Sequence, residues 1–163
     1  MLQLWDIRKV QSKFTKKSTP KCSPVSTQIA TGSINSAFFS PSGKYLLSTN
    51  LGDKIDILSD AHLESGHIKK PTHSIRHDNH TGRWLSTFMA RWHPSITNEE
   101  LFVVGSMQHP RTMEIFDGNQ GKLLRGIQGN AISNVVSRCC FHSSSEKLIV
   151  MGGTSSGRVV VAQ

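Results

Sequence analysis

Hydrophobic and polar positions follow one order three times along the chain: an apolar run ending in an aromatic residue, a polar turn, a second apolar run, another turn and a third run. In the first copy the three runs are residues 34–39, 45–49 and 54–58. Apolar and polar residues alternate in the run 54–58, which is the two-residue period of a half-buried strand. Each copy therefore predicts a small antiparallel sheet.

The second copy runs from Phe88 to Asp117 with longer turns, and the third runs from Val135 to Ala162. The aromatic residues that close the first run of each copy are Phe39, Trp92 and Phe141. They recur about every 50 residues, somewhat more than the roughly 40 to 45 of a typical WD-type propeller blade. Insertions in the outer connections would account for the difference.

A Trp-Asp pair near the start of the chain supplies the signature of such blades. Leu2-Gln3-Leu4-Trp5-Asp6 has the form of the usual end of a blade's third strand, and Phe116-Asp117 stands at the same place in the second copy. We therefore predict an all-β fold, a partial WD40 β-propeller with about three complete four-stranded blades plus the end of a fourth.

The predicted boundaries treat residues 1–163 as part of a single propeller. They are a blade end at about 1–31, blades at about 32–75, 85–130 and 131–163, and an inserted loop at 62–84. Because a propeller closes with typically four to eight blades, we expect further blades to complete the ring. We interpret the sequence as the C-terminal portion of a longer protein.

Strand order assigns the turns of a propeller to two opposite ends. One end is expected to carry the stretch 69–84 and the turns 50–53, 107–111 and 152–157. The other end is expected to carry the turns 40–44, 93–100 and 117–121 and the lysine-rich stretch 8–21.

The charge of the chain favours an acidic partner. Lys and Arg total 19 against 11 Asp and Glu, which gives a formal charge of +8 and a pI near 9.8. Long-range attraction of this sign favours phosphate backbones or acidic proteins without selecting between them, and a merely solvated basic surface is the alternative. No run approaches the roughly 20 apolar residues of a membrane span, so we expect an intracellular protein without a membrane partner.

The stretch before the second complete blade combines residue types that suit nucleic acid. An indole or guanidinium plane stacks on an unstacked base for about 1 to 3 kcal/mol, and neighbouring arginines neutralise phosphates. The alternative for the indole is a packing role beneath the loop. The candidate DNA-binding residues are Arg76, His77, Gly82, Arg83, Trp84 and Arg111.

Other motifs carry no chemistry that we can assemble into a site. The three cysteines, Cys22, Cys139 and Cys140, lack Cys-x-x-Cys spacing, which argues against disulfides and structural zinc. His77 and His80 alone do not make a recognisable zinc pattern. The Gly-x-Ser-x-Gly match at 153–157 precedes a predicted strand instead of the helix that a nucleophile elbow needs. We therefore expect no catalytic residues, no metal, no cofactor and no small-molecule substrate.

Several motifs together resemble one branch of WD-repeat proteins, the changed-mutation-rate and damaged-DNA-binding branch. The most particular of them is Gly82-Arg83-Trp84-Leu85 followed by Ala90-Arg91-Trp92-His93-Pro94. The resemblance covers nearly the whole chain and implies the C-terminal half of a seven-bladed propeller. The remaining motifs are Leu4-Trp5-Asp6-Ile7-Arg8, Ala37-Phe38-Phe39-Ser40-Pro41-Ser42-Gly43 and Phe116-Asp117-Gly118-Asn119-Gln120-Gly121-Lys122.

The resemblance implies roles for individual residues. In the damaged-DNA-binding members the loop matching 80–84 is a hairpin that enters the minor groove at a lesion, which makes Arg83 and Trp84 the insertion candidates. The hairpin tip differs in sequence, so lesion selectivity does not carry over. Arg111 matches a basic position beside the DNA. Trp5, Asp6 and Arg8 match a Trp-Asp-x-Arg motif that docks substrate receptors on the adaptor of cullin-RING ubiquitin ligases, with Arg8 as the contact.

We therefore expect a non-enzymatic nuclear DNA-binding protein that acts in the DNA damage response. The alternative is a protein-interaction scaffold, either a substrate receptor of a cullin-RING ubiquitin ligase or a chromatin adaptor, in which DNA contact is incidental.

Overall fold

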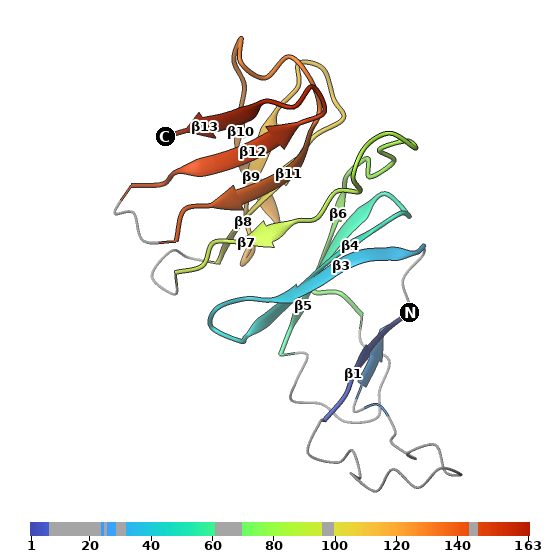
Figure 1. The fold of residues 1–163 in the computed structure, drawn as a ribbon. Helices are drawn as coiled ribbons and strands as arrows, with labels where there is room; N and C mark the ends of the chain where they lie inside the picture. The colour runs from blue at the N-terminus through green and yellow to red at the C-terminus, as the bar shows by residue number, and fades with distance from the viewer. Residues whose placement is uncertain (7–23, 25, 29–31, 61–69, 96–99, 144–146) are drawn as a thin grey trace, which may run out of the picture.

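The chain forms a series of separate antiparallel β-sheets in a computed structural model (Figure 1). The structure describes residues 1–6, 24, 26–28, 32–60, 70–95, 100–143 and 147–163. All regular elements within these ranges are strands, so the described residues contain no helix that is long and apolar enough to cross a membrane.

Two of the sheets have four strands, in the order expected for propeller blades. In the first, β3, β4, β5 and β6 lie side by side in chain order, and in the second β7, β8, β9 and β10 do the same. Their bounds are Ile34–Phe39, Tyr45–Asn50, Lys54–Ser59 and His73–Arg76, then Arg91–Trp92, Leu101–Gly105, Met113–Asp117 and Lys122–Ile127.

The sheets at the two ends of the chain are smaller. β1 (Leu2–Leu4) pairs with β2 (Ser26–Gln28), and this pair corresponds to the predicted blade end. β11 (Val136–Phe141), β12 (Val150–Thr154) and β13 (Val159–Ala162) form the last sheet. The all-β propeller architecture is confirmed, but this last sheet has three strands within the described residues, where four were expected.

The stretch 62–84 was predicted as an inserted loop, but it contains strand β6 (His73–Arg76). The stretch is therefore divided into a connection before this strand and another, 77–90, after it. Among the described strands, β6 is the outer one of its sheet and pairs with β5. Its single apolar residue, Ile75, gives too short an alternation to stand out from the polar sequence around it.

Apolar layers between successive sheets hold the structure together. The layer between the first two sheets contains Leu47, Ile57, Phe88, Trp92 and Phe102 among its buried members. The Phe102 ring lies edge-on to the Trp92 ring at 5.6 Å between centroids and stacks on the Phe116 ring at 5.0 Å. Of the three recurring aromatic residues, Trp92 and Phe141 are buried in such layers, whereas Phe39 is 45% exposed.

The second and third sheets meet in another apolar layer, which includes Val103, Met113 and Val150. At Gly105 the two sheets touch through their backbones: a Cβ added there would lie 1.7 Å from the carbonyl oxygen of Val136. Only glycine fits this contact.

The adjacent cysteines confirm strand alternation in β11. Cys139 is buried and Cys140 is exposed. Burial, together with the neighbouring Cys140, raises the pKa of the Cys139 thiol to about 12, so this thiol stays protonated at neutral pH.

The connection 77–90 lies at the expected end of the sheets, but the start of the stretch 69–84 lies at the opposite end. At one end the His77 amide donates to the carbonyl of Asp53 (3.0 Å), which joins the connection 77–90 to the turn between β4 and β5. At the other end a ring nitrogen of His73 contacts the carbonyl of Asn119 (2.9 Å). The stretch 8–21 lies outside the described residues, and its predicted position stays untested.

Truncating Phe102 tests the apolar layer between the first two sheets. We expect Phe102→Ala to lower the free energy of unfolding by about 3–5 kcal/mol, because it removes a fully buried ring that two other aromatic rings contact. Chemical denaturation followed by tryptophan fluorescence measures the loss. The control is Phe39→Ala, which truncates a ring that is 45% exposed and should cost at most about 1 kcal/mol. Equal losses in the two variants would contradict this account of the core.

Candidate nucleic-acid interface

The connection 77–90 leaves the outer strand β6 and returns to the interior before β7. Asn79, at its start, is completely buried, and Phe88, near its end, belongs to the apolar layer between the first two sheets. Both sides of the connection are therefore anchored, and the residues between them are held at the end of the molecule that carries the turn between β4 and β5.

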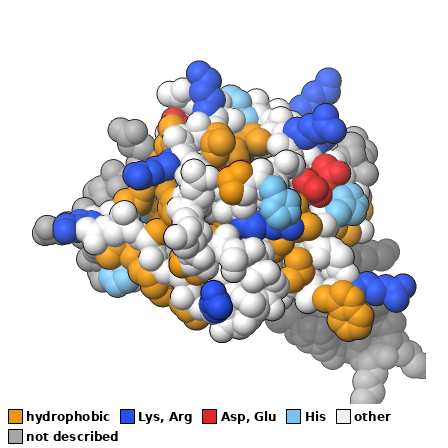
Figure 2. Space-filling view, turned by 90° about the horizontal axis from the view of Figure 1, so that it is seen from above, with side chains coloured by type: hydrophobic (Ala, Val, Ile, Leu, Met, Phe, Trp, Pro, Cys, Tyr) orange, Lys and Arg blue, Asp and Glu red, His pale blue; other side chains and the backbone are white. Residues whose placement is uncertain are grey.

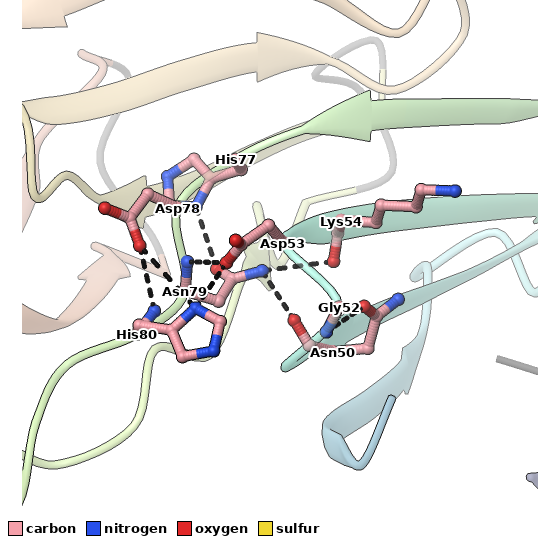
Figure 3. Close-up of polar contacts among 8 residues, drawn as sticks. All are labelled: Asn50, Gly52, Asp53, Lys54, His77, Asp78, Asn79 and His80. Carbon is pink, nitrogen blue, oxygen red and sulfur yellow. Dashed lines mark hydrogen bonds and ion pairs between the residues drawn. The ribbon is translucent and has the colours of Figure 1, made fainter. Parts of the chain in front are cut away.

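The Asn79 side chain ties this connection to the first sheet (Figure 3). Its Nδ2 donates to the carbonyls of Asn50 (2.8 Å) and Lys54 (3.1 Å), which flank the turn between β4 and β5. Its backbone amide donates to Oδ1 of Asp53 (3.0 Å) within that turn. A buried amide with this many partners fixes the position of the backbone around it.

His77 supports Asn79 from the interior. Because Nδ2 of Asn79 donates to two carbonyls, its Oδ1 is the acceptor for Nδ1–H of His77 at 2.8 Å. The other ring nitrogen, Nε2, lies 3.7 Å from a carboxylate oxygen of Glu114 and has no hydrogen-bond partner within the part of the chain that the structure describes. His77 was predicted among the DNA-binding residues, but its ring is buried and packs edge-on against Phe88, so it positions the loop.

The tip of the connection points into solvent. Thr81 is buried, whereas Gly82, Arg83 and Trp84 are exposed, and the Trp84 side chain is 95% exposed. Gly82 has a φ of +70°, a left-handed conformation that favours glycine and turns the chain outward. The alternative that Trp84 packs beneath the loop is therefore wrong. Leu85, next in the chain, is the residue that packs against the core.

Two further predicted residues lie at the same end. Arg76 ends β6 opposite Lys54, and its side chain is close enough to Asp53 to lower the pKa of that carboxyl. Arg111 is half-buried and donates through Nη1 to the carbonyl of Met107 in its own turn. Figure 2 looks onto this end, where Lys and Arg side chains are spread widely and acidic side chains form a small group beside histidines.

A polar cavity of about 460 Å³ opens between the first two sheets at this end. It brings the end of β6 and the start of the connection 77–90 together with the turn between β8 and β9. Its lining residues are Asp53, Arg76, His77, Asp78, Ser106, Gln108 and Glu114.

The surroundings of Asp53 favour its ionised form. The Asn79 amide that donates to it is the main cause that lowers its pKa below 3.8, with smaller contributions from His80 and Arg76. Because the pKa of Asp53 is lower in the folded state, its ionised form stabilises the fold. This contribution is fully present above the pKa of the unfolded state and is lost as the pH falls through the pKa of the folded state.

The predicted partner-binding residues are only partly described. Trp5 follows β1 and is 43% exposed, and Asp6 is half-buried. Arg8, the predicted contact with a ligase adaptor, lies outside the described residues.

Sequence reasoning missed the residues that hold the loop, above all Asn79 and Asp53. Each acts through a partner on another strand or turn, so no local spacing indicates its role. A polar residue in a stretch predicted as a loop gives no signal that it is buried.

Replacing Asn79 tests whether it holds the connection in place. We expect Asn79→Ala to lower the free energy of unfolding by about 1–3 kcal/mol or more, because two backbone carbonyls and the His77 ring lose their partner. Amide hydrogen exchange should rise across 77–90. Ser86→Ala, at an exposed position of the same connection, is the matched control and should change neither quantity. Unchanged exchange in Asn79→Ala would show that another contact anchors the loop.

Comparisons with known proteins place these features beside WD-repeat proteins. The chain is 37% identical over 130 residues to WD repeat-containing protein 76 of Mus musculus, covering 79% of this chain and 20% of that protein. It is 29% identical over 159 residues to DNA damage-binding protein 2 of Gallus gallus, covering 90% of this chain and 28% of that protein. It is 26% identical over 167 residues to DNA damage-binding protein cmr1 of Neurospora crassa, covering 97% of this chain and 30% of that protein. The chain thus spans less than a third of the length of these relatives, and no family model matches it.

Proposed function

Because this chain belongs to the WD-repeat branch that includes WD repeat-containing protein 76 and the DNA damage-binding proteins, we propose that it binds duplex DNA through the loop 81–85. In this proposal the protein acts in the nucleus, in the response to DNA damage, and catalyses no reaction. Arg83 and Trp84 probe the duplex, and Arg76 and Arg111 contact phosphates.

The exposure of Trp84 is the observation that carries this proposal. A tryptophan side chain buries roughly 150–250 Å² of surface when it packs, and leaving it in water forfeits about 25 cal/mol for each Å² of apolar area. Trp84 is nevertheless 95% exposed, whereas Trp92 lies in the core. An indole held in this way recovers the burial energy when it stacks on or wedges between bases.

The loop is prepared for such a contact before any partner arrives. Asn79 and Phe88 anchor its two sides, and Gly82 sets the direction of its tip. A tip on fixed supports loses little conformational entropy on binding, so more of the stacking energy contributes to affinity.

Charge supports a nucleic-acid partner in a less specific way. The chain carries a formal charge of +8, and Arg76, Arg83 and Arg111 lie at the same end of the sheets. Arginines that bind phosphates position a duplex without reading its sequence. The resulting affinity depends on salt because counterions are released from the DNA.

Truncating the loop tip tests the proposal. We expect Arg83→Ala with Trp84→Ala in the full chain to weaken duplex binding at least tenfold, about 1.4 kcal/mol, because the stacking plane and one cation are lost together. Fluorescence anisotropy with a labelled duplex measures the dissociation constant at several salt concentrations.

The matched control removes an arginine and a large apolar side chain elsewhere. Leu124 and Arg125 are exposed on the outer strand β10, away from the loop, and their double alanine variant should bind DNA with nearly unchanged affinity. The proposal fails if the loop variant binds as tightly as the wild type, or if both double variants weaken binding equally. Binding that does not respond to salt would count against phosphate contacts.

A further inference from the structure

Three potential metal ligands converge beside the loop, and nothing in the proposed DNA contact uses them. Asp53 comes from the turn between β4 and β5, and Asp78 and His80 come from the connection after β6. One ligand atom of each lies within 4.8 Å of the others. We propose that these three side chains bind a divalent first-row transition-metal ion such as Zn²⁺.

Backbone contacts hold the ligands in place without an ion. Oδ1 of Asp53 accepts the Asn79 amide (3.0 Å), and Oδ1 of Asp78 accepts the His80 amide (3.1 Å). Asp53 itself has a φ of 55°, and its carbonyl accepts the His77 amide (3.0 Å). The turn and the connection are therefore fixed against each other, which lowers the cost of gathering the ligands.

The His80 ring faces both carboxylates. Its Nδ1 lies 2.8 Å from Oδ1 of Asp53 and 3.9 Å from Oδ1 of Asp78. In the neutral ring Nδ1 carries a proton that it donates to Asp53. An ion would take the place of this proton on Nδ1 while the proton moves to Nε2, so the ring stays neutral.

The donor set selects the class of metal. One imidazole nitrogen with two carboxylate oxygens suits Zn²⁺ and neighbouring transition metals, whereas Ca²⁺ and Mg²⁺ prefer oxygen ligands alone. The three side chains are 43% to 64% exposed, which leaves room for water in the remaining coordination positions.

A second observation points to a ligand at this place. Asp53 and Asp78 also line the 460 Å³ cavity, and the His77 ring lines it with them. The His77 side chain is only 5% exposed, and its Nε2 lies 3.7 Å from Oε2 of Glu114 without a hydrogen-bond partner among the described residues. Water bound to a metal ion is a strong hydrogen-bond donor, so a hydrated ion beside this cavity would offer a hydrogen-bond partner to the buried His77 ring and the Glu114 carboxylate.

Metal titration of the full chain tests the site without reference to DNA. We expect the protein, stripped with a chelator, to take up one Zn²⁺ in a saturable isothermal titration and to show a visible absorption band with Co²⁺. The work is done in a Cys22→Ser, Cys140→Ser background so that these thiols do not compete. Asp78→Asn and His80→Ala should each weaken Zn²⁺ binding at least tenfold, because each removes a ligand.

The control variant is His109→Ala, which removes an exposed histidine from the turn between β8 and β9 at the same end. It should bind Zn²⁺ like the parent protein. Asp78→Asn keeps an oxygen for the His80 amide, and circular dichroism verifies that it folds. Zn²⁺ should raise the melting temperature of the parent and not that of His80→Ala. The proposal is overturned if no saturable uptake occurs, or if His80→Ala and Asp78→Asn bind Zn²⁺ as tightly as the parent.

Discussion

The apolar layer between the first two sheets is the interaction on which both the fold and the loop depend. Phe102 and Trp92 from the second sheet meet Leu47 and Ile57 from the first, and Phe88 from the connection joins them. The same contact thus packs two blades together and holds one side of the loop that carries Trp84. An isolated sheet would have no partner for its apolar face and no support for the loop.

The fold could be predicted to a large extent from local patterns. The recurrence of Phe39, Trp92 and Phe141 marks one strand in each repeat, and alternation in 54–58 identifies a strand that the structure shows as β5. The bounds of β6 were not predicted, although the blade predicted at about 32–75 ends within this strand, because an outer strand pairs along one edge and needs few apolar residues. Neither β-propensity nor the alternation of apolar and polar residues indicates such a strand, because it forms through backbone pairing with its neighbour.

The residues at the tip of the loop could be predicted from the sequence, but the contacts that hold the loop could not. The sequence identified Arg83 and Trp84 as unusual neighbours, but it left open whether the indole was buried or exposed, and only the fold decides that. His77 was assigned to the surface by its place in a polar stretch. Its burial follows from Asn79 and Phe88, and the bonds of Asn79 reach residues far away in the chain.

The glycine at position 105 has a consequence for both the packing of the sheets and the support of the loop that carries Trp84. Side chains between two sheets can change rotamer and let the sheets slide, but a contact of backbone against backbone has no such freedom. The close contact at Gly105 therefore leaves no space for a side chain between the second and third sheets. Because the Phe88 ring also lies against this position, a side chain at 105 would disturb both the contact between the two sheets and one anchor of the connection that presents Trp84.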